Sequence, residues 1–310
     1  MASKYCIWLL AVGVSLSAFA QKPLETTQRP QTTIRAEVAL VNVIFTATGR
    51  DRKPAAGLKT EDFLVFEDRK PQEILYFSDW TQGSEVPLTI ALLIDTSGSV
   101  KNRLDYEKRT AAEFFKQVLR KNVDLALIIQ FDSDVNLVQD FTDDQDRLAS
   151  ALERLRAGNS TSLYDAVFLA VEEKLKLETG RKVIVVITDG EDTSSRVSEK
   201  EAIEVAQRND VLVYGIGVKG DYSANFGVLK KFAEDTGGSF FSPNSNLEEI
   251  RDSFRAIGED LKGQYNLAYQ SSNQKKDGKF RNVELRCKVP GVRIRTRKGY
   301  YAPRSDGKQH

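Results

Sequence analysis

Residues 87–99 read PLTIALLIDTSGS, and this stretch decides the fold. Its first part, residues 87–94, is an almost continuous apolar run, as expected for a strand that is covered on both faces. The run ends in a short loop rich in carboxyl and hydroxyl groups. Residues 101–120 follow with Leu104, Ala111, Phe115 and Val118 on one helical stripe. A buried strand that leads into an amphipathic helix is the repeating unit of an α/β sheet.

The same alternation continues to residue 262. Helical patterns begin after Ser162 and cover residues 199–209, 226–236 and 247–262. Strand patterns cover residues 124–131, 135–141 (short and edge-like), 182–189, 211–218 and 238–242. The sequence therefore predicts a doubly wound, mainly parallel α/β sheet, within a domain of residues 85–263.

Both flanks of this domain have strand patterns without long helical segments. The N-terminal β segment, residues 34–84, contains EVALVNVIFTA, DFLVFED and EILYFSDW. The C-terminal β segment, residues 264–303, contains YNLAYQ, KFRNVELRCKV and VRIRTRKGYY. Each flank has too few core residues to be stable alone, so we expect both to combine into one accessory β-sandwich. Arg293, Arg295 and Arg297 alternate along the last segment, and we expect them to form a solvated face.

The ends of the chain have patterns of their own. Lys4, the apolar residues 7–16 and the small-x-small sequence Ala18-Phe19-Ala20 predict a signal peptide over residues 1–20 that is cut after Ala20. Residues 21–33 read as a flexible leader, and residues 304–310 as a disordered tail. These features predict a secreted or periplasmic protein that has no stable membrane insertion after cleavage.

Composition excludes several classes of function. With 45 Lys+Arg against 44 Asp+Glu, the net charge of +1 gives no general attraction to nucleic acid. The single histidine is His310, the last residue, so neither a histidine base nor a histidine metal ligand is expected.

Oxygen-bearing side chains gather in three loops of the predicted sheet. Asp95, Ser97 and Ser99 follow the first buried strand, Asp189 follows the strand at residues 182–188, and Thr161 precedes a helix. In such sheets, ligands bind outside the carboxyl ends of the strands. Each loop alone could be an ordinary helix cap or turn. Together their carboxylates and hydroxyls favour a hard divalent cation, Mg²⁺ before Mn²⁺ or Ca²⁺, with no organic cofactor.

The pattern Asp95-Thr-Ser97-Gly-Ser99, with Thr161 and Thr188-Asp189-Gly190, resembles the metal-ion-dependent adhesion site of von Willebrand factor A domains. The flanks also resemble the von Willebrand factor A-related proteins of Acidobacteria. This resemblance implies that Ser97 and Ser99 bind the metal directly and that Thr161 joins them in the ligand-competent state. It also implies that Asp95 and Asp189 act through bound water or hold the hydroxyls, and that a partner's Asp or Glu completes the coordination.

Three functions follow as hypotheses. The leading one is a secreted, non-enzymatic module that binds a partner protein through the cation. The first alternative is a structural or assembly component of the cell envelope, in which the metal mainly stabilises the fold. The second is a phosphotransferase with Asp95 as nucleophile, but dehalogenase-like phosphatases carry Asp-x-Asp and this chain has Ser97 at the second position. We therefore expect no enzyme activity.

Overall fold

The computed structural model describes residues 40–51, 53–219, 224–243 and 247–305. The predicted signal peptide and leader, the first residues of the N-terminal β segment and most of the C-terminal tail lie outside the described residues. No helix within the described ranges is long and apolar enough to cross a membrane.

A six-stranded sheet forms the centre of the α/β domain, in the order β10-β9-β8-β5-β6-β7. The strands are β5 (Leu88–Asp95), β6 (Leu125–Phe131), β7 (Val135–Thr142), β8 (Arg181–Thr188), β9 (Val211–Gly217) and β10 (Phe240–Phe241). All neighbours pair in parallel except β6 and β7, so β7 is an antiparallel edge strand. This confirms the predicted mainly parallel sheet.

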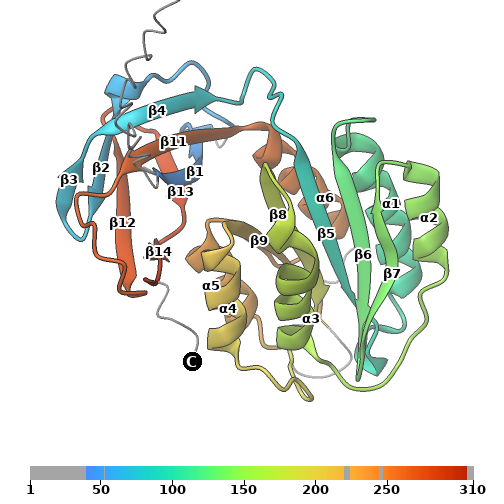
Figure 1. Ribbon diagram of the computed structural model, residues 1–310. Helices are drawn as coiled ribbons and strands as arrows, with labels where there is room; N and C mark the ends of the chain where they lie inside the picture. The colour runs from blue at the N-terminus through green and yellow to red at the C-terminus, as the bar shows by residue number, and fades with distance from the viewer. Residues whose placement is uncertain (1–39, 52, 220–223, 244–246, 306–310) are drawn as a thin grey trace, which may run out of the picture. The chain divides into compact units, whose positions relative to one another are not determined.

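Helices cover both faces of this sheet (Figure 1). On one face lie α1 (Leu104–Val118), α2 (Gln145–Glu153) and α6 (Leu247–Lys262); on the other lie α3 (Leu163–Leu169), α4 (Glu199–Arg208) and α5 (Gly227–Thr236). Every residue of β5 is buried. Because side chains alternate along a strand, Leu92 joins the core of the first face while Leu93 joins that of the second. This explains why the sequence of β5 is almost continuously apolar up to Asp95.

Four short helical segments complete the described helices: η1 (Thr60–Asp62), η2 (Gly98–Val100), the π-helical η3 (Ala170–Lys174) and η4 (Leu175–Leu177). Two regular elements were not predicted. Helix α2 begins after Asp144, whose side chain accepts hydrogen bonds from the N–H groups of Asp146 and Arg147 as an N-cap. Strand β3 (Lys70–Gln72) lies between the predicted strand segments DFLVFED and EILYFSDW.

The two flanks combine into two antiparallel sheets. Their orders are β13-β1-β11-β4 and β14-β12-β2-β3. The remaining strands are β1 (Leu40–Thr48), β2 (Phe63–Glu67), β4 (Ile74–Asp79), β11 (Gln264–Gln270), β12 (Phe280–Cys287), β13 (Arg293–Thr296) and β14 (Gly299–Tyr301). Each sheet takes strands from both flanks, and the sheets share one core in which Phe45 stacks on Tyr265 at 5.4 Å between ring centroids. The predicted accessory β-sandwich is confirmed.

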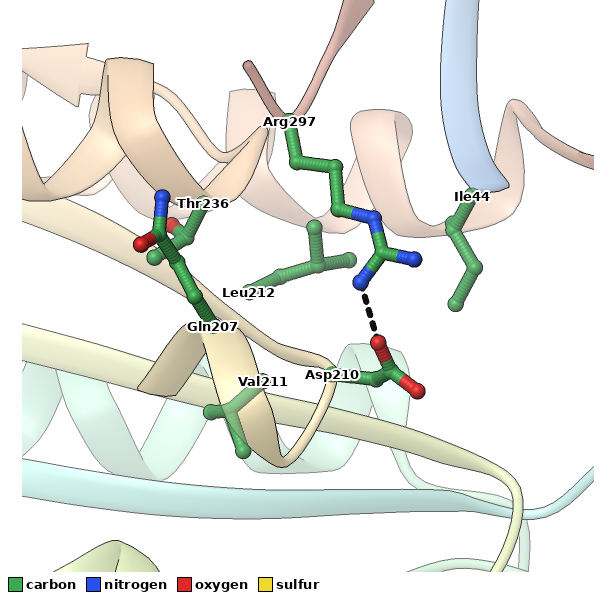
Figure 2. A pocket seen from close by; sticks show the side chains of 7 residues that line it. All are labelled: Ile44, Gln207, Asp210, Val211, Leu212, Thr236 and Arg297. Atoms are coloured by element: carbon green, nitrogen blue, oxygen red, sulfur yellow. Dashed lines mark hydrogen bonds and ion pairs between the residues drawn. The ribbon is translucent and has the colours of Figure 1, made fainter. Parts of the chain in front are cut away.

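The arginine face predicted to be solvated is wrong at two of its three positions. Arg295 pairs with Asp260 of α6 at 2.5 Å, and Arg297, which is only 7% exposed, pairs with Asp210 in the turn between α4 and β9. Figure 2 shows Arg297 reaching Asp210 across a small cavity of about 20 Å³. Acidic groups distant in sequence lie against this strand, which alternation along the strand alone could not reveal. Arg293 is exposed as expected.

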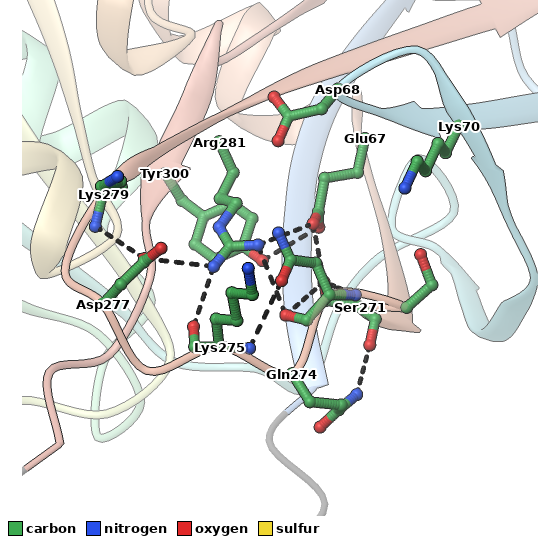
Figure 3. A network of polar contacts seen from close by, with 12 residues as sticks. Glu67, Asp68, Lys70, Ser271, Gln274, Lys275, Asp277, Lys279, Arg281 and Tyr300 are labelled. Carbon is green, nitrogen blue, oxygen red and sulfur yellow. Dashed lines mark hydrogen bonds and ion pairs between the residues drawn. The ribbon is translucent and has the colours of Figure 1, made fainter.

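A buried polar network lies within the sandwich (Figure 3). At its centre Glu67, 2% exposed, accepts hydrogen bonds from Ser271 Oγ at 2.6 Å, Tyr300 OH at 2.9 Å and Tyr269 OH at 3.0 Å. Arg281, also 2% exposed, lies 3.8 Å from its carboxylate. This buried carboxylate is therefore fully partnered, as a buried charge must be if it is not to cost several kcal/mol.

Candidate metal centre

Asp95 is the last residue of β5, and it organises the loop that follows. One carboxylate oxygen, Oδ1, accepts the backbone N–H of Ser97 at 2.8 Å, and the other, Oδ2, accepts the hydroxyl of Thr188 at 2.5 Å. Asp95 is fully buried. Burial raises its pKa to about 6; the hydrogen bonds from Thr188 and Ser97 oppose this rise, and the charge of Asp189 adds to it. Asp95 thus ties the loop after β5 to the end of β8.

Backbone hydrogen bonds bring the three predicted loops together. The N–H of Gly98 donates to the carbonyl of Asn159 at 3.1 Å, and the N–H of Gly158 donates to the carbonyl of Thr96 at 2.5 Å. The middle loop is in turn joined to the loop after β8, because the carbonyl of Thr161 accepts from two N–H groups there, at 2.9 and 3.1 Å. All three loops therefore meet at the carboxyl ends of β5 and β8.

Three of the predicted ligands lie within hydrogen-bonding distance of one another. Ser97 Oγ lies 3.1 Å from Ser99 Oγ, and Ser99 Oγ donates to Asp189 Oδ2 at 2.6 Å. In an octahedral Mg²⁺ site with ligands at about 2.1 Å, neighbouring oxygens are about 3.0 Å apart. The separation of the two serine hydroxyls thus fits adjacent positions around a small hard cation, while the 2.6 Å contact is a hydrogen bond by which Asp189 holds the hydroxyl of Ser99.

Thr161 is 5% exposed and lies on the neighbouring loop. Its backbone makes the hydrogen bonds that fix it: the N–H donates to Thr193 Oγ1 at 3.0 Å, and the carbonyl accepts from Thr193 and Ser194. The structure thus places Thr161 in the loop that packs on the other two, while the direct contacts among ligand oxygens involve Ser97, Ser99 and Asp189.

Gly190 has a steric role beside Asp189. Its φ is +84°, and a Cβ at this position would lie 2.1 Å from the carbonyl oxygen of Asn225. Only glycine accommodates both the left-handed backbone and this close approach. Glycine at position 190 is therefore required by the backbone of the loop after β8.

The donor set fits a hard cation. Among the described residues there is no cluster of three or more His, Cys, Asp or Glu side chains that could hold a metal. The candidate centre instead combines carboxylates with neutral hydroxyls, a set that suits Mg²⁺ better than a soft transition metal.

Sequence analysis missed two residues beside this centre. Thr188 belongs to the Thr188-Asp189-Gly190 motif noted in the sequence, but its role in donating a hydrogen bond to Asp95 was not predicted. Glu107 on α1 is 1% exposed, and the charges of Asp95 and Asp189 both act on it. A signal for Glu107 was present, because it lies three residues after Leu104 and four before Ala111, on the apolar stripe of the helix.

The family model for the von Willebrand factor type A domain matches residues 89–256, slightly more than half of the chain. This chain belongs to that family. The matched residues run from β5 into α6 and include all three loops of the candidate centre. The family therefore accounts for the α/β domain, whereas most of the β-sandwich lies outside the match.

The chain is also similar to a curated protein and to solved structures. An uncharacterised protein of Borreliella burgdorferi is 26% identical over 188 residues, which are 51% of this chain and 54% of that protein, so the chain spans about half the length of this curated relative. Proximal thread matrix protein 1 from the mussel byssus, solved with a zinc-occupied MIDAS motif, is 15% identical with a TM-score of 0.52. That match covers 61% of this chain and 49% of the mussel protein, and it shows a shared fold. BatB from Bacteroides thetaiotaomicron is 20% identical with a TM-score of 0.46, over 56% of this chain and 99% of that one.

Proposed function

We propose that this chain is an exported von Willebrand factor A-domain protein that binds a partner protein through a divalent cation. The proposed ligands are Asp95, Ser97, Ser99, Thr161 and Asp189. The observation that carries the proposal is the placement of Ser97, Ser99 and Asp189, whose oxygens are 3.1 and 2.6 Å apart at the carboxyl ends of β5 and β8. Membership of the family supports a role in adhesion or protein interaction in general.

The chemistry of these residues supports recognition of a carboxylate. Ser97, Ser99 and Thr161 are neutral donors, so a cation bound by them keeps much of its positive charge. Such a cation supplies the electrostatic attraction for an Asp or Glu side chain of the partner. The mussel neighbour carries zinc in its motif; for this chain Mg²⁺ is favoured because the proposed donors are all oxygens.

We also propose that the chain is not an enzyme. Asp95 is the acid that a phosphotransferase would use as nucleophile, but it is fully buried and both its oxygens accept hydrogen bonds. A nucleophile needs an exposed lone pair directed at the substrate. The contacts of Asp95 support a role in holding the loop.

The alternative is an envelope component in which the cation mainly stabilises the fold. It requires that the three loops depend on the metal for their arrangement. Instead, Asp95, Gly98 and Gly158 already link them through hydrogen bonds made within the protein. This observation favours recognition over a purely structural metal.

The test is calorimetric titration of the mature protein with MgCl₂ and with MnCl₂, beside the variant Asp189→Asn. We expect saturable binding at one site in the wild type and at least a tenfold loss in the variant. Asp134→Asn is the matched control, because Asp134 is an exposed carboxylate just after β6, at the same edge of the sheet. Equal binding by the wild type and Asp189→Asn, or no binding by the wild type, would contradict the proposal.

The role of the cation is tested separately. If the metal serves recognition, Asp189→Asn keeps its circular dichroism spectrum and loses binding to carboxylate-bearing partner proteins. Loss of the folded spectrum in the metal-free wild type would favour the structural alternative.

A further inference from the structure

Glu107 is a buried acid that the proposed ligand set does not use. It lies on the first turn of α1, eight residues after Ser99, and is 1% exposed. Both of its carboxylate oxygens are buried, and neither has a hydrogen-bond partner among the described residues. An unpartnered buried polar group is rare in native structures and calls for a reason.

Two other buried charged side chains have hydrogen-bond partners, unlike Glu107. Glu67 in the sandwich accepts three hydrogen bonds and lies beside Arg281. Lys108, the next residue after Glu107, is 5% exposed and donates to the carbonyl of Leu155 at 3.0 Å. Both of these charged groups have partners, and among the described residues Glu107 is the acid whose buried carboxylate oxygens have none.

The charges that act on Glu107 are those of the candidate metal centre. Its pKa is raised to about 8, mainly by burial and next by the negative charge of Asp95, while Arg103 opposes the rise and Asp189 adds to it. No ion pair joins Glu107 to Arg103, whose Nη1 is also buried without a partner. Without a cation, burial and the neighbouring acids therefore disfavour the ionised form of Glu107, and Arg103 offsets this only in part.

We infer that Glu107 is an additional carboxylate of the cation site, which strengthens cation binding by its negative charge. This inference rests on the proposed function. Glu107 is a positioning residue, since the described residues hold no cluster of three acids that could share one metal. The neutral hydroxyls of Ser97 and Ser99 leave the cation's charge poorly compensated, and a third carboxylate nearby stabilises it without occupying a coordination position that the partner needs.

The inference explains why an unpartnered acid is retained. A divalent cation near Asp95 and Asp189 reverses the sign of the local field. A negative charge on Glu107 is therefore unfavourable in the metal-free protein and favourable in the metal-bound one. Glu107 therefore has opposite effects on the two states. Residues that serve structure alone do not have this property.

The test compares Glu107→Gln, Glu107→Asp and wild type by calorimetric titration with MgCl₂ alone. Gln keeps the shape of the side chain without its charge, and we expect it to weaken Mg²⁺ binding by about tenfold or more. Asp keeps the charge, so it should retain more affinity than Gln. Glu113→Gln is the control, because Glu113 lies on the same helix but is exposed; it should bind Mg²⁺ as the wild type does.

Thermal unfolding of the same variants in EDTA supplies a second readout. We expect metal-free Glu107→Gln to be at least as stable as the wild type although it binds Mg²⁺ less tightly. Wild-type Mg²⁺ affinity in Glu107→Gln, or lower stability of both variants in EDTA, would overturn the inference while leaving the proposed metal site intact. Failure of the wild type to bind Mg²⁺ would instead reject the proposed function itself.

Discussion

Replacing Glu107 by Gln should change how the stability of the metal-free protein depends on pH. Burial raises the pKa of Glu107 from its ordinary value of 4.5 to about 8. Between these values the folded protein keeps a proton that the unfolded chain releases. Stability is therefore highest below pH 4.5 and falls as the pH rises toward 8. Gln has no proton to lose, so this contribution is absent from the variant.

The magnitude follows from the two pKa values. One pKa unit corresponds to about 1.4 kcal/mol, so the contribution of Glu107 to the free energy of unfolding should fall by about 2.5 kcal/mol between pH 5 and pH 7. The pKa of Asp95 is also raised, to about 6, so Asp95 lowers the free energy of unfolding further as the pH rises, in the wild type and in the variant alike. Because the negative charge of Asp95 acts on Glu107, the removal of one acid also eases the ionisation of the other.

The assay is urea unfolding of both proteins in EDTA at pH 5, 6, 7 and 8. As the pH rises, the variant Glu107→Gln should become increasingly stable relative to the wild type, as measured by the free energy of unfolding. For a chain of this size, a difference of about 2.5 kcal/mol in unfolding free energy corresponds to a relative shift of about 4 °C in Tm. Parallel pH profiles for the two proteins would refute the assignment of Glu107 as a buried, uncompensated acid.

Three further outcomes are expected. Gly190→Ala should destabilise the protein by at least about 2 kcal/mol in urea unfolding, because φ is +84° and the new Cβ would lie 2.1 Å from the carbonyl of Asn225; an unchanged midpoint would contradict this. Arg297→Met should cost about 1–3 kcal/mol, because it removes the pairing with Asp210; wild-type stability would show that this ion pair contributes nothing. Mg²⁺ at one hundred times its Kd should stabilise the wild type by about 2.7 kcal/mol over EDTA, and an equal gain in Asp189→Asn would place the ion elsewhere.

The α/β fold could be predicted because its signals are local. A strand buried on both faces must be largely apolar, and the central parts of β5 and β8 are. Helix α6 was predicted over its full length, Leu247–Lys262, because its apolar residues recur at helical spacing. Helix α2 was missed although Asp144 forms its N-cap, because a nine-residue helix leaves few periods to recognise.

The pairing of strands in the β-sandwich and the surroundings of the candidate site could not be predicted from the sequence and are seen only in the structure. Sequence indicated strands at both ends of the chain, and their small size suggested that they combine, but only the pairing of β1 with β11 shows how. Arg295 and Arg297 face acids that belong to distant elements, so alternation along the strand gave the wrong environment for both.

The sequence by itself determined the oxygen donors at the strand ends, because the residue types and their positions after buried strands are both local properties. Only the tertiary structure decided the distances between those donors and the isolation of Glu107. Burial and the presence of a partner depend on which side chains from other elements fill the surrounding space, and spacing along one helix does not contain that information.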